Sequence, residues 1–120
     1  MNTTPYDLRK WTSLYALEVI KFLETLASDY ISQTIGKQLL RSATSIGANV
    51  VEGRASSSRK DFANFYNHAL KSANESLFWL ELLRDGGKAL SDGVHPLIDE
   101  TRQLAKILAS CLITTKGRRS

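Results

Sequence analysis

Apolar residues recur every three or four positions in four stretches of the 120-residue chain, the spacing that aligns side chains on one face of an α-helix. The stretches cover about residues 6–28, 32–53, 58–84 and 95–115. We find no sustained period-two alternation, which is the pattern typical of strands. The pattern predicts one all-α domain over residues 1–120, an antiparallel up-down four-helix bundle followed by a basic tail at 116–120.

The end of the third stretch carries more apolar surface than one face of a helix can hold. Residues 77–83 are apolar at six of seven positions, and at 100° per residue they surround the helix. Some of these side chains therefore point away from the core, and the first stretch has the same surplus. The surplus residues are Phe78, Trp79 and Leu82 in the third stretch and Leu14 and Leu17 in the first.

Either the tail or a loop, or a second copy of the chain, could cover this surplus. The tail is polar and basic, which makes it a poor cover. Burying a side chain of this size stabilises an interface by roughly 1.5–3 kcal/mol. We therefore expect a homo-oligomer in which these five residues form the interface, closed as a ring or a dimer.

A row of polar residues lies beside the apolar face of the second stretch. Serine and asparagine are mediocre helix formers, and their side chains readily form hydrogen bonds. We favour a structural role over ligand binding, with partners on the third stretch. The row consists of Gln38, Arg41, Ser45, Asn49 and Glu52, and the partners are Ser72 and Glu75.

Positive charge gathers at two places. The chain has 16 lysines and arginines against 12 acidic residues, a net charge of +4. Arg54, Arg59 and Lys60 form one basic group, and Lys116, Arg118 and Arg119 form the other. Each group is either a solvated loop or tail, or a set of phosphate contacts. Phosphate binding needs several such charges on one surface.

The residues that catalysis or metal binding would need are missing at recognised spacings. The two histidines, His68 and His95, have no nucleophile or carboxylate at a catalytic spacing, and no Glu-x-x-His segment of a di-iron bundle occurs. The single cysteine, Cys111, falls on the apolar face of the fourth stretch. We expect no enzymatic activity and no cofactor. The sequence also lacks a signal-peptide pattern and any apolar run of about 18 residues, so we expect a cytoplasmic protein.

Residues 38–53 resemble the signature of a bacterial four-helix-bundle family, the 23S rRNA intervening-sequence proteins. The family pattern has glutamine, arginine, serine, asparagine and glutamate-glycine at the spacing of Gln38, Arg41, Ser45, Asn49 and Glu52-Gly53. Two positions depart from it: Gly47 stands where the family commonly has proline, and Lys71 replaces a usual glycine. Further matches are Asp7-Leu8 with Trp11; Ser58, Asp61, Phe62, Phe65 and Tyr66; Ala69, Ser72 and Glu75; and Lys106-Ile107-Leu108 with Leu112-Ile113.

The resemblance implies a simple bundle that assembles as a homopentamer, and most members of the family have no assigned activity. Related proteins accompany the reverse transcriptases of diversity-generating retroelements, where the basic pentamer is similar to a nucleic-acid-binding adaptor. Five copies of a chain with net charge +4 carry about +20, which makes a multivalent phosphate-binding surface plausible.

Three functions remain open from the sequence. The first is a non-enzymatic homo-oligomer that binds RNA or DNA phosphates with low sequence specificity. The second is a protein–protein adaptor, and the third is a purely structural oligomer without a ligand. We expect no membrane partner and no small-molecule substrate. For the first function, the contacts are expected from Arg41, Arg54, Arg59, Lys60, Arg118 and Arg119.

Overall fold

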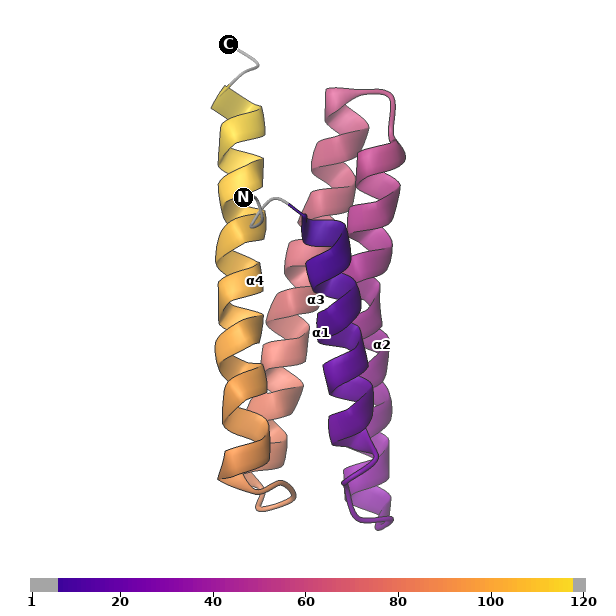
Figure 1. Ribbon diagram of the computed structural model, residues 1–120, viewed down its shortest axis with the longest axis vertical. Coiled ribbons are helices and arrows are strands. Elements are labelled where there is room, and N and C mark those ends of the chain that lie inside the picture. The colour runs from indigo at the N-terminus through magenta and orange to yellow at the C-terminus, as the bar shows by residue number, and fades with distance from the viewer. Residues whose placement is uncertain (1–6, 118–120) are drawn as a thin grey trace.

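The computed structural model describes residues 7–117, which form four helices. The helices run alternately up and down along a molecule of 50 × 27 × 20 Å (Figure 1). The predicted all-α four-helix bundle is thereby confirmed. The helices are α1 (Leu8–Leu23), α2 (Tyr30–Ala55), α3 (Arg59–Asp85) and α4 (Ser91–Gly117).

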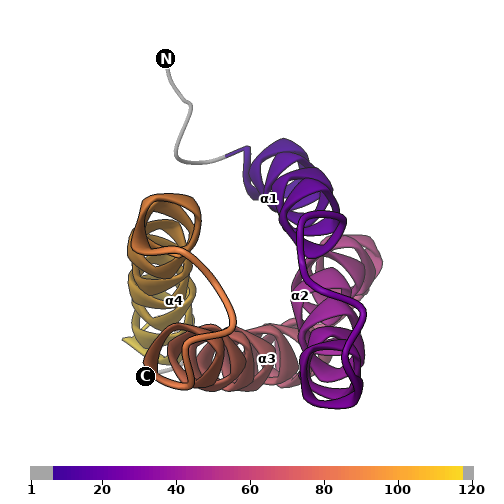
Figure 2. The same ribbon diagram turned by 90° about the horizontal axis from the view of Figure 1, so that it is seen from below.

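Figure 2 shows α2 between α1 and α3, and α3 between α2 and α4, so that α1 and α3 occupy diagonal corners. The first helix is much shorter than the others, with 16 residues against 26 or 27. At 1.5 Å per residue it is about 24 Å long, whereas the others reach about 40 Å. The end of the bundle that carries the α2–α3 link therefore consists of three helices, because α1 begins part-way along the bundle (Figure 1).

The core is built from the apolar rows that the periodicity predicts, and all four helices contribute to it. Small residues such as Ala43 and Ala73 let α2 and α3 approach closely. Among the buried residues are Tyr15, Val19 and Phe22 on α1; Leu39, Ile46 and Val50 on α2; Tyr66, Leu80 and Leu83 on α3; and Ile98, Leu104, Leu108 and Leu112 on α4.

The first helix ends earlier than the sequence predicts, at Leu23 and not near residue 28. The N–H groups of Thr25 and Leu26 donate three residues back, to the carbonyls of Phe22 and Leu23, which tightens the last turn. The chain then reverses, and the Asp29 side chain accepts from the N–H of Ser32 (3.1 Å) to begin α2. Leu26 still packs against the core from this turn, which is why the apolar pattern continues past the helix.

The fourth helix begins at Ser91, four residues before the predicted start. A start at residue 95 would place Pro96 in the first turn, but in the structure it is the sixth residue of the helix. Proline lacks an N–H, so the helix loses only the bond to the carbonyl of Asp92, close to its exposed beginning. The other predicted boundaries agree with the structure to within two residues.

Gly47 marks a close approach between α1 and α2, and α2 continues through it without a break. A Cβ atom at this position would come 3.1 Å from Oγ1 of Thr12. Glycine therefore lets the two helices pack closely where the family pattern has proline. At the other departure from that pattern, the Lys71 side chain is exposed on α3.

Candidate nucleic-acid interface

A link of three serines, residues 56–58, joins α2 to α3. The hydroxyl of Ser56 donates to the Gly53 carbonyl (2.6 Å) at the end of α2. The hydroxyl of Ser58 accepts from the N–H of Asp61 (3.1 Å) and caps α3. Serine side chains thus satisfy backbone groups at the end of α2 and at the start of α3.

Three cationic side chains, Arg54, Arg59 and Lys60, flank this link, and all three are exposed. Arg54 lies in the last turn of α2, where the helix dipole favours a cation. Arg59 and Lys60 lie in the first turn of α3, where the dipole favours an anion, and Asp61 supplies one negative charge there. These two cations therefore oppose the dipole, and a bound anion would offset that cost. We call this end of the bundle the basic end.

The fourth helix finishes at the basic end as well (Figure 1). Its last turn contains Lys116. Arg118 and Arg119 lie outside the described residues. Both are phosphate contacts predicted from the sequence. The described part of α4 thus ends at the same end of the bundle as the α2–α3 link.

Arg41 does not belong to this group. It is exposed on α2, 13 residues before Arg54, which places it about 20 Å away along the helix. The structure therefore separates Arg41 from the other predicted phosphate contacts.

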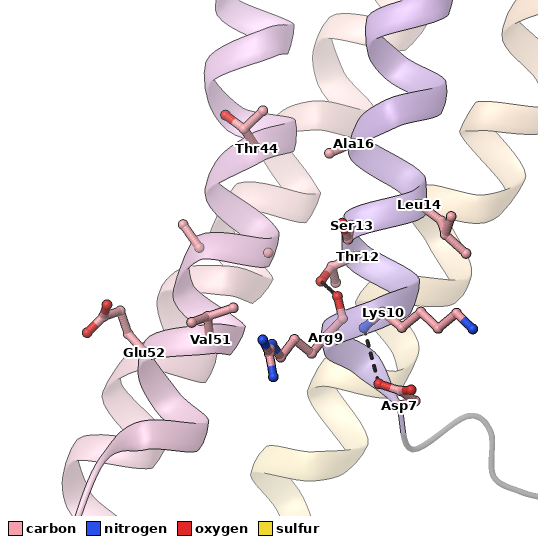
Figure 3. A pocket seen from close by; sticks show the side chains of 12 residues that line it. Asp7, Arg9, Lys10, Thr12, Ser13, Leu14, Ala16, Thr44, Val51 and Glu52 are labelled. Carbon is pink, nitrogen blue, oxygen red and sulfur yellow. Dashed lines mark hydrogen bonds between the residues drawn. The ribbon is translucent and has the colours of Figure 1, made fainter.

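An open groove of about 780 Å³ lies between the start of α1 and the second half of α2 (Figure 3). Small side chains such as Ala16 line it, and charged side chains stand at its rim. Arg9 points from α1 toward α2, whereas Lys10 points away from α2 (Figure 3). Sequence reasoning did not single out either cation, because each belongs to an ordinary amphipathic pattern and only the fold shows that both line this groove.

Part of the predicted polar row joins α2 to α3. The hydroxyl of Ser72 donates to Oγ of Ser45 (3.0 Å). Nδ2 of Asn49 donates to the carbonyl (2.9 Å) and to the hydroxyl (3.0 Å) of Ser45. Glu75 instead accepts from the indole N–H of Trp79 on its own helix (3.1 Å). Of the remaining members, Gln38 is half-buried, and Arg41 and Glu52 are exposed.

Deeper hydrogen bonds between helices were not anticipated from the sequence. Ser42 and Ser76 share a buried hydroxyl–hydroxyl bond of 2.8 Å between α2 and α3. Tyr15 and Thr101 share another, of 2.6 Å, between α1 and α4. Burial raises the pKa of Tyr15 to about 12, because the charged phenolate would be poorly solvated there. These bonds belong to the core and join α2 to α3 and α1 to α4.

The surplus apolar residues are exposed in the single chain. Leu14 and Leu17 are 52% and 50% exposed, and Phe78 and Leu82 are 53% and 39% exposed. Trp79 is half-buried, and its ring meets that of Phe78 edge to face with centroids 5.0 Å apart. The helical periodicity therefore identified side chains that one copy of the chain leaves in contact with water.

No group of three or more metal-ligating side chains occurs among residues 7–117. His68 and His95 are exposed on different helices. Cys111 is half-buried, and burial raises the pKa of its thiol, which disfavours the reactive thiolate. Within the described part of the chain, no helix is long and apolar enough to cross a membrane.

Comparisons with known proteins agree with this fold. The family model of the 23S rRNA-intervening sequence protein matches residues 7–110. A solved structure from Bacteroides thetaiotaomicron, a protein with unknown function from the S23 ribosomal protein family, is similar with a TM-score of 0.80 and 33% sequence identity. The similarity covers 87% of this chain and 93% of that chain. No curated protein matches the sequence. Because the family model spans most of the chain and all four helices, this protein belongs to the 23S rRNA-intervening sequence protein family.

Proposed function

We propose that this chain is a non-enzymatic, homo-oligomeric four-helix bundle that binds the RNA or DNA backbone at its basic end. The observation that carries the proposal is the common location of Arg54, Arg59 and Lys60 at the end to which α4 leads. Phosphate contacts from such side chains position a nucleic acid without reading its sequence.

The start of α3 suits a phosphate group for two reasons. The dipole of α3 favours an anion at this end, where Asp61 supplies only one negative charge. Arg59 and Lys60 add two positive charges at the same place. Both lie on a helix whose cap, Ser58, is already formed in the single chain. The backbone that carries the two cations is therefore ordered before an anion binds.

Low sequence specificity follows from the aromatic residues near this end. Base recognition on single strands commonly uses exposed aromatic rings as stacking platforms. Phe62 and Tyr66 stack on each other with centroids 4.1 Å apart, and Tyr66 is buried. Each ring therefore has one face covered by the other, and binding should rest mainly on phosphates.

Self-association belongs to the same proposal because one chain offers few phosphate contacts. The exposed Phe78 and Leu82 on α3 and Leu14 and Leu17 on α1 supply apolar surface for contacts between copies. Repetition of the basic end by symmetry multiplies the contacts on a single nucleic acid and raises avidity without new chemistry.

The test removes the charges at the basic end. The triple variant Arg54→Gln, Arg59→Gln, Lys60→Gln is compared with wild type for binding to a labelled single-stranded RNA over a range of salt concentrations. Each phosphate contact contributes about 0.7 to the slope of log affinity against log salt. We expect the triple variant to bind more weakly and its slope to fall by about 2 for each copy engaged.

A matched control removes the same charge elsewhere. Lys37, Lys71 and Lys106 are exposed and lie away from the basic end, so changing all three to glutamine alters net charge but not the proposed contacts. We expect this control to retain most of the affinity. A wild-type protein that does not bind RNA at low salt contradicts the proposal. An equal loss of affinity in both triple variants would mean that binding depends on overall charge, and it would contradict a binding site at the basic end.

A further inference from the structure

Two exposed rows on different helices have matching patterns of opposite charge. The α1 row has two leucines flanked by lysines, and the α3 row has two apolar residues flanked by acids. Each row follows one helical face, with steps of 4, 3 and 4 on α1 and of 3, 4 and 3 on α3. The α1 row is Lys10, Leu14, Leu17 and Lys21, and the α3 row is Glu75, Phe78, Leu82 and Asp85; all eight side chains are exposed.

The two rows cannot cover each other within one chain. Their helices occupy diagonal corners of the bundle (Figure 2), and each row lies opposite the core face of its own helix. Figure 3 shows Lys10 and Leu14 on the side of α1 that faces away from α2. Each row therefore needs its cover from outside the chain.

We infer that the α1 row of one copy packs against the α3 row of a second copy. The inference rests on the self-association in the proposed function and adds which surfaces meet. The leucines of one row contact Phe78 and Leu82 of the other, and the lysines lie beside the acids. Since each copy keeps one open α1 row and one open α3 row, such contacts continue from copy to copy until a ring closes.

The positions of the two rows along the bundle axis are compatible with this contact. Helices α1 and α3 both run away from the basic end (Figure 1). The hydroxyl of Ser76 on α3 lies beside that of Tyr15 on α1. The residues next to them, Glu75 and Leu14, are therefore at the same level. If the helices are inclined to the ring axis, neighbouring copies meet with a displacement of about one helical turn, roughly 6 Å. This displacement places Lys10 beside the second copy's Glu75 and Lys21 beside its Asp85.

Existing contacts organise the α3 row for docking. Glu75 holds the indole of Trp79 by the 3.1 Å hydrogen bond, and the indole meets the ring of Phe78 edge to face. A ring that is already fixed loses little conformational entropy on association. Asp85 is paired with Arg84 (2.8 Å), and Lys21 lies 3.9 Å from Glu18, so these two flanking charges exchange or share partners when the rows meet.

The experiment reverses the charges of one row and then of both, with mass in solution as the readout. Lys10→Glu with Lys21→Glu makes both rows acidic, and Glu75→Lys with Asp85→Lys makes both basic. Like charges then face each other across the contact, and we expect each double variant to dissociate toward the 13.4 kDa single chain. The quadruple variant has an acidic α1 row and a basic α3 row, and we expect it to assemble again.

Controls separate this inference from the proposal on which it rests. Lys37→Glu with Lys106→Glu reverses two exposed charges outside the rows and should leave the mass unchanged. Circular dichroism checks that every variant keeps its helices. A wild-type monomer contradicts self-association itself. A wild-type oligomer whose double variants remain assembled, or whose quadruple variant stays dissociated, leaves self-association standing and overturns the α1–α3 contact.

Discussion

Tyr15 is a fully buried aromatic side chain whose hydroxyl bonds to another helix. The hydroxyl of Thr101 donates to the carbonyl of Leu97 on its own helix. Tyr15 must therefore be the donor to Thr101, because the threonine proton is already used. A phenolate at this position would lack the proton that the contact needs, in addition to being desolvated.

Replacing Tyr15 by phenylalanine should lower the free energy of unfolding by about 1–2 kcal/mol, since a buried hydrogen bond between α1 and α4 is lost while the ring is kept. Urea unfolding measures the change. Tyr30→Phe is the matched control, because Tyr30 is 82% exposed and should change stability very little. Equal stability of the Tyr15 variant and wild type would show that the hydroxyl contributes nothing.

The pH dependence of the same variant gives a second readout. The pKa of Tyr15 rises from 10.0 to about 12 on folding, so the folded state holds the proton more tightly than the unfolded state. This contribution to stability is complete below pH 10 and is lost as the pH rises from 10 to 12. We expect wild type to lose more stability over that window than Tyr15→Phe, measured by urea unfolding at each pH.

At the scale of helix pairs, the contact of α2 with α3 depends on Gly53. A Cβ atom there would come 2.8 Å from two ring atoms of Tyr66, and that ring is buried and stacked on Phe62. The ring cannot easily move aside, so a side chain at position 53 would push the helices apart beside the α2–α3 link.

Gly53→Ala should therefore destabilise the protein by about 1–3 kcal/mol through overpacking, although alanine favours a helix over glycine by up to about 1 kcal/mol. Gly93→Ala is the control, because its Cβ would lie 3.9 Å from the Phe22 ring, an ordinary contact. Thermal unfolding should show a lower Tm for the first variant and an unchanged or higher Tm for the second. A Gly53→Ala variant as stable as wild type would mean that the Tyr66 ring can move aside without cost.

The helices and the exposed apolar residues could be predicted because both follow from periodicity along a single helix. At 100° per residue, Phe78 points away from the core face that contains Leu80. The side-chain exposure agrees, because Phe78 is exposed and Leu80 is buried. The end of α1 was missed because Leu26 continues the pattern from a turn. The Ser42–Ser76 bond was missed because it depends on which turns of two helices lie side by side, and a single sequence does not specify that register.

The candidate site, too, could be predicted only in part from the sequence. The cations beside the α2–α3 link are neighbours in the sequence, so they could be grouped from it. Arg41 could not be excluded until the length of α2 was known. The groove lined by Arg9 could not be foreseen, because it forms only where the start of α1 lies beside α2. The sequence alone identified only those cations that are close together along the chain.

For the molecule as a whole, the common direction of α1 and α3 decides what kind of ring the proposed contact makes. Both helices run in the same direction from the basic end (Figure 1). A ring axis inclined by a small angle to these helices allows the one-turn displacement and still keeps every basic end on the same side. Such a ring would have two unlike faces, one with the basic ends and one without them.

A two-faced ring fixes the stoichiometry of nucleic-acid binding. A strand long enough to span the charged face should saturate the assembly at one molecule per ring, since the opposite face offers no basic end. Titration with such an RNA under stoichiometric conditions, with the mass of the complex measured, tests this. Two strands per ring would mean that copies alternate in direction. One strand per ring would make the assembly a directional platform, able to present a nucleic acid to a partner on one side only.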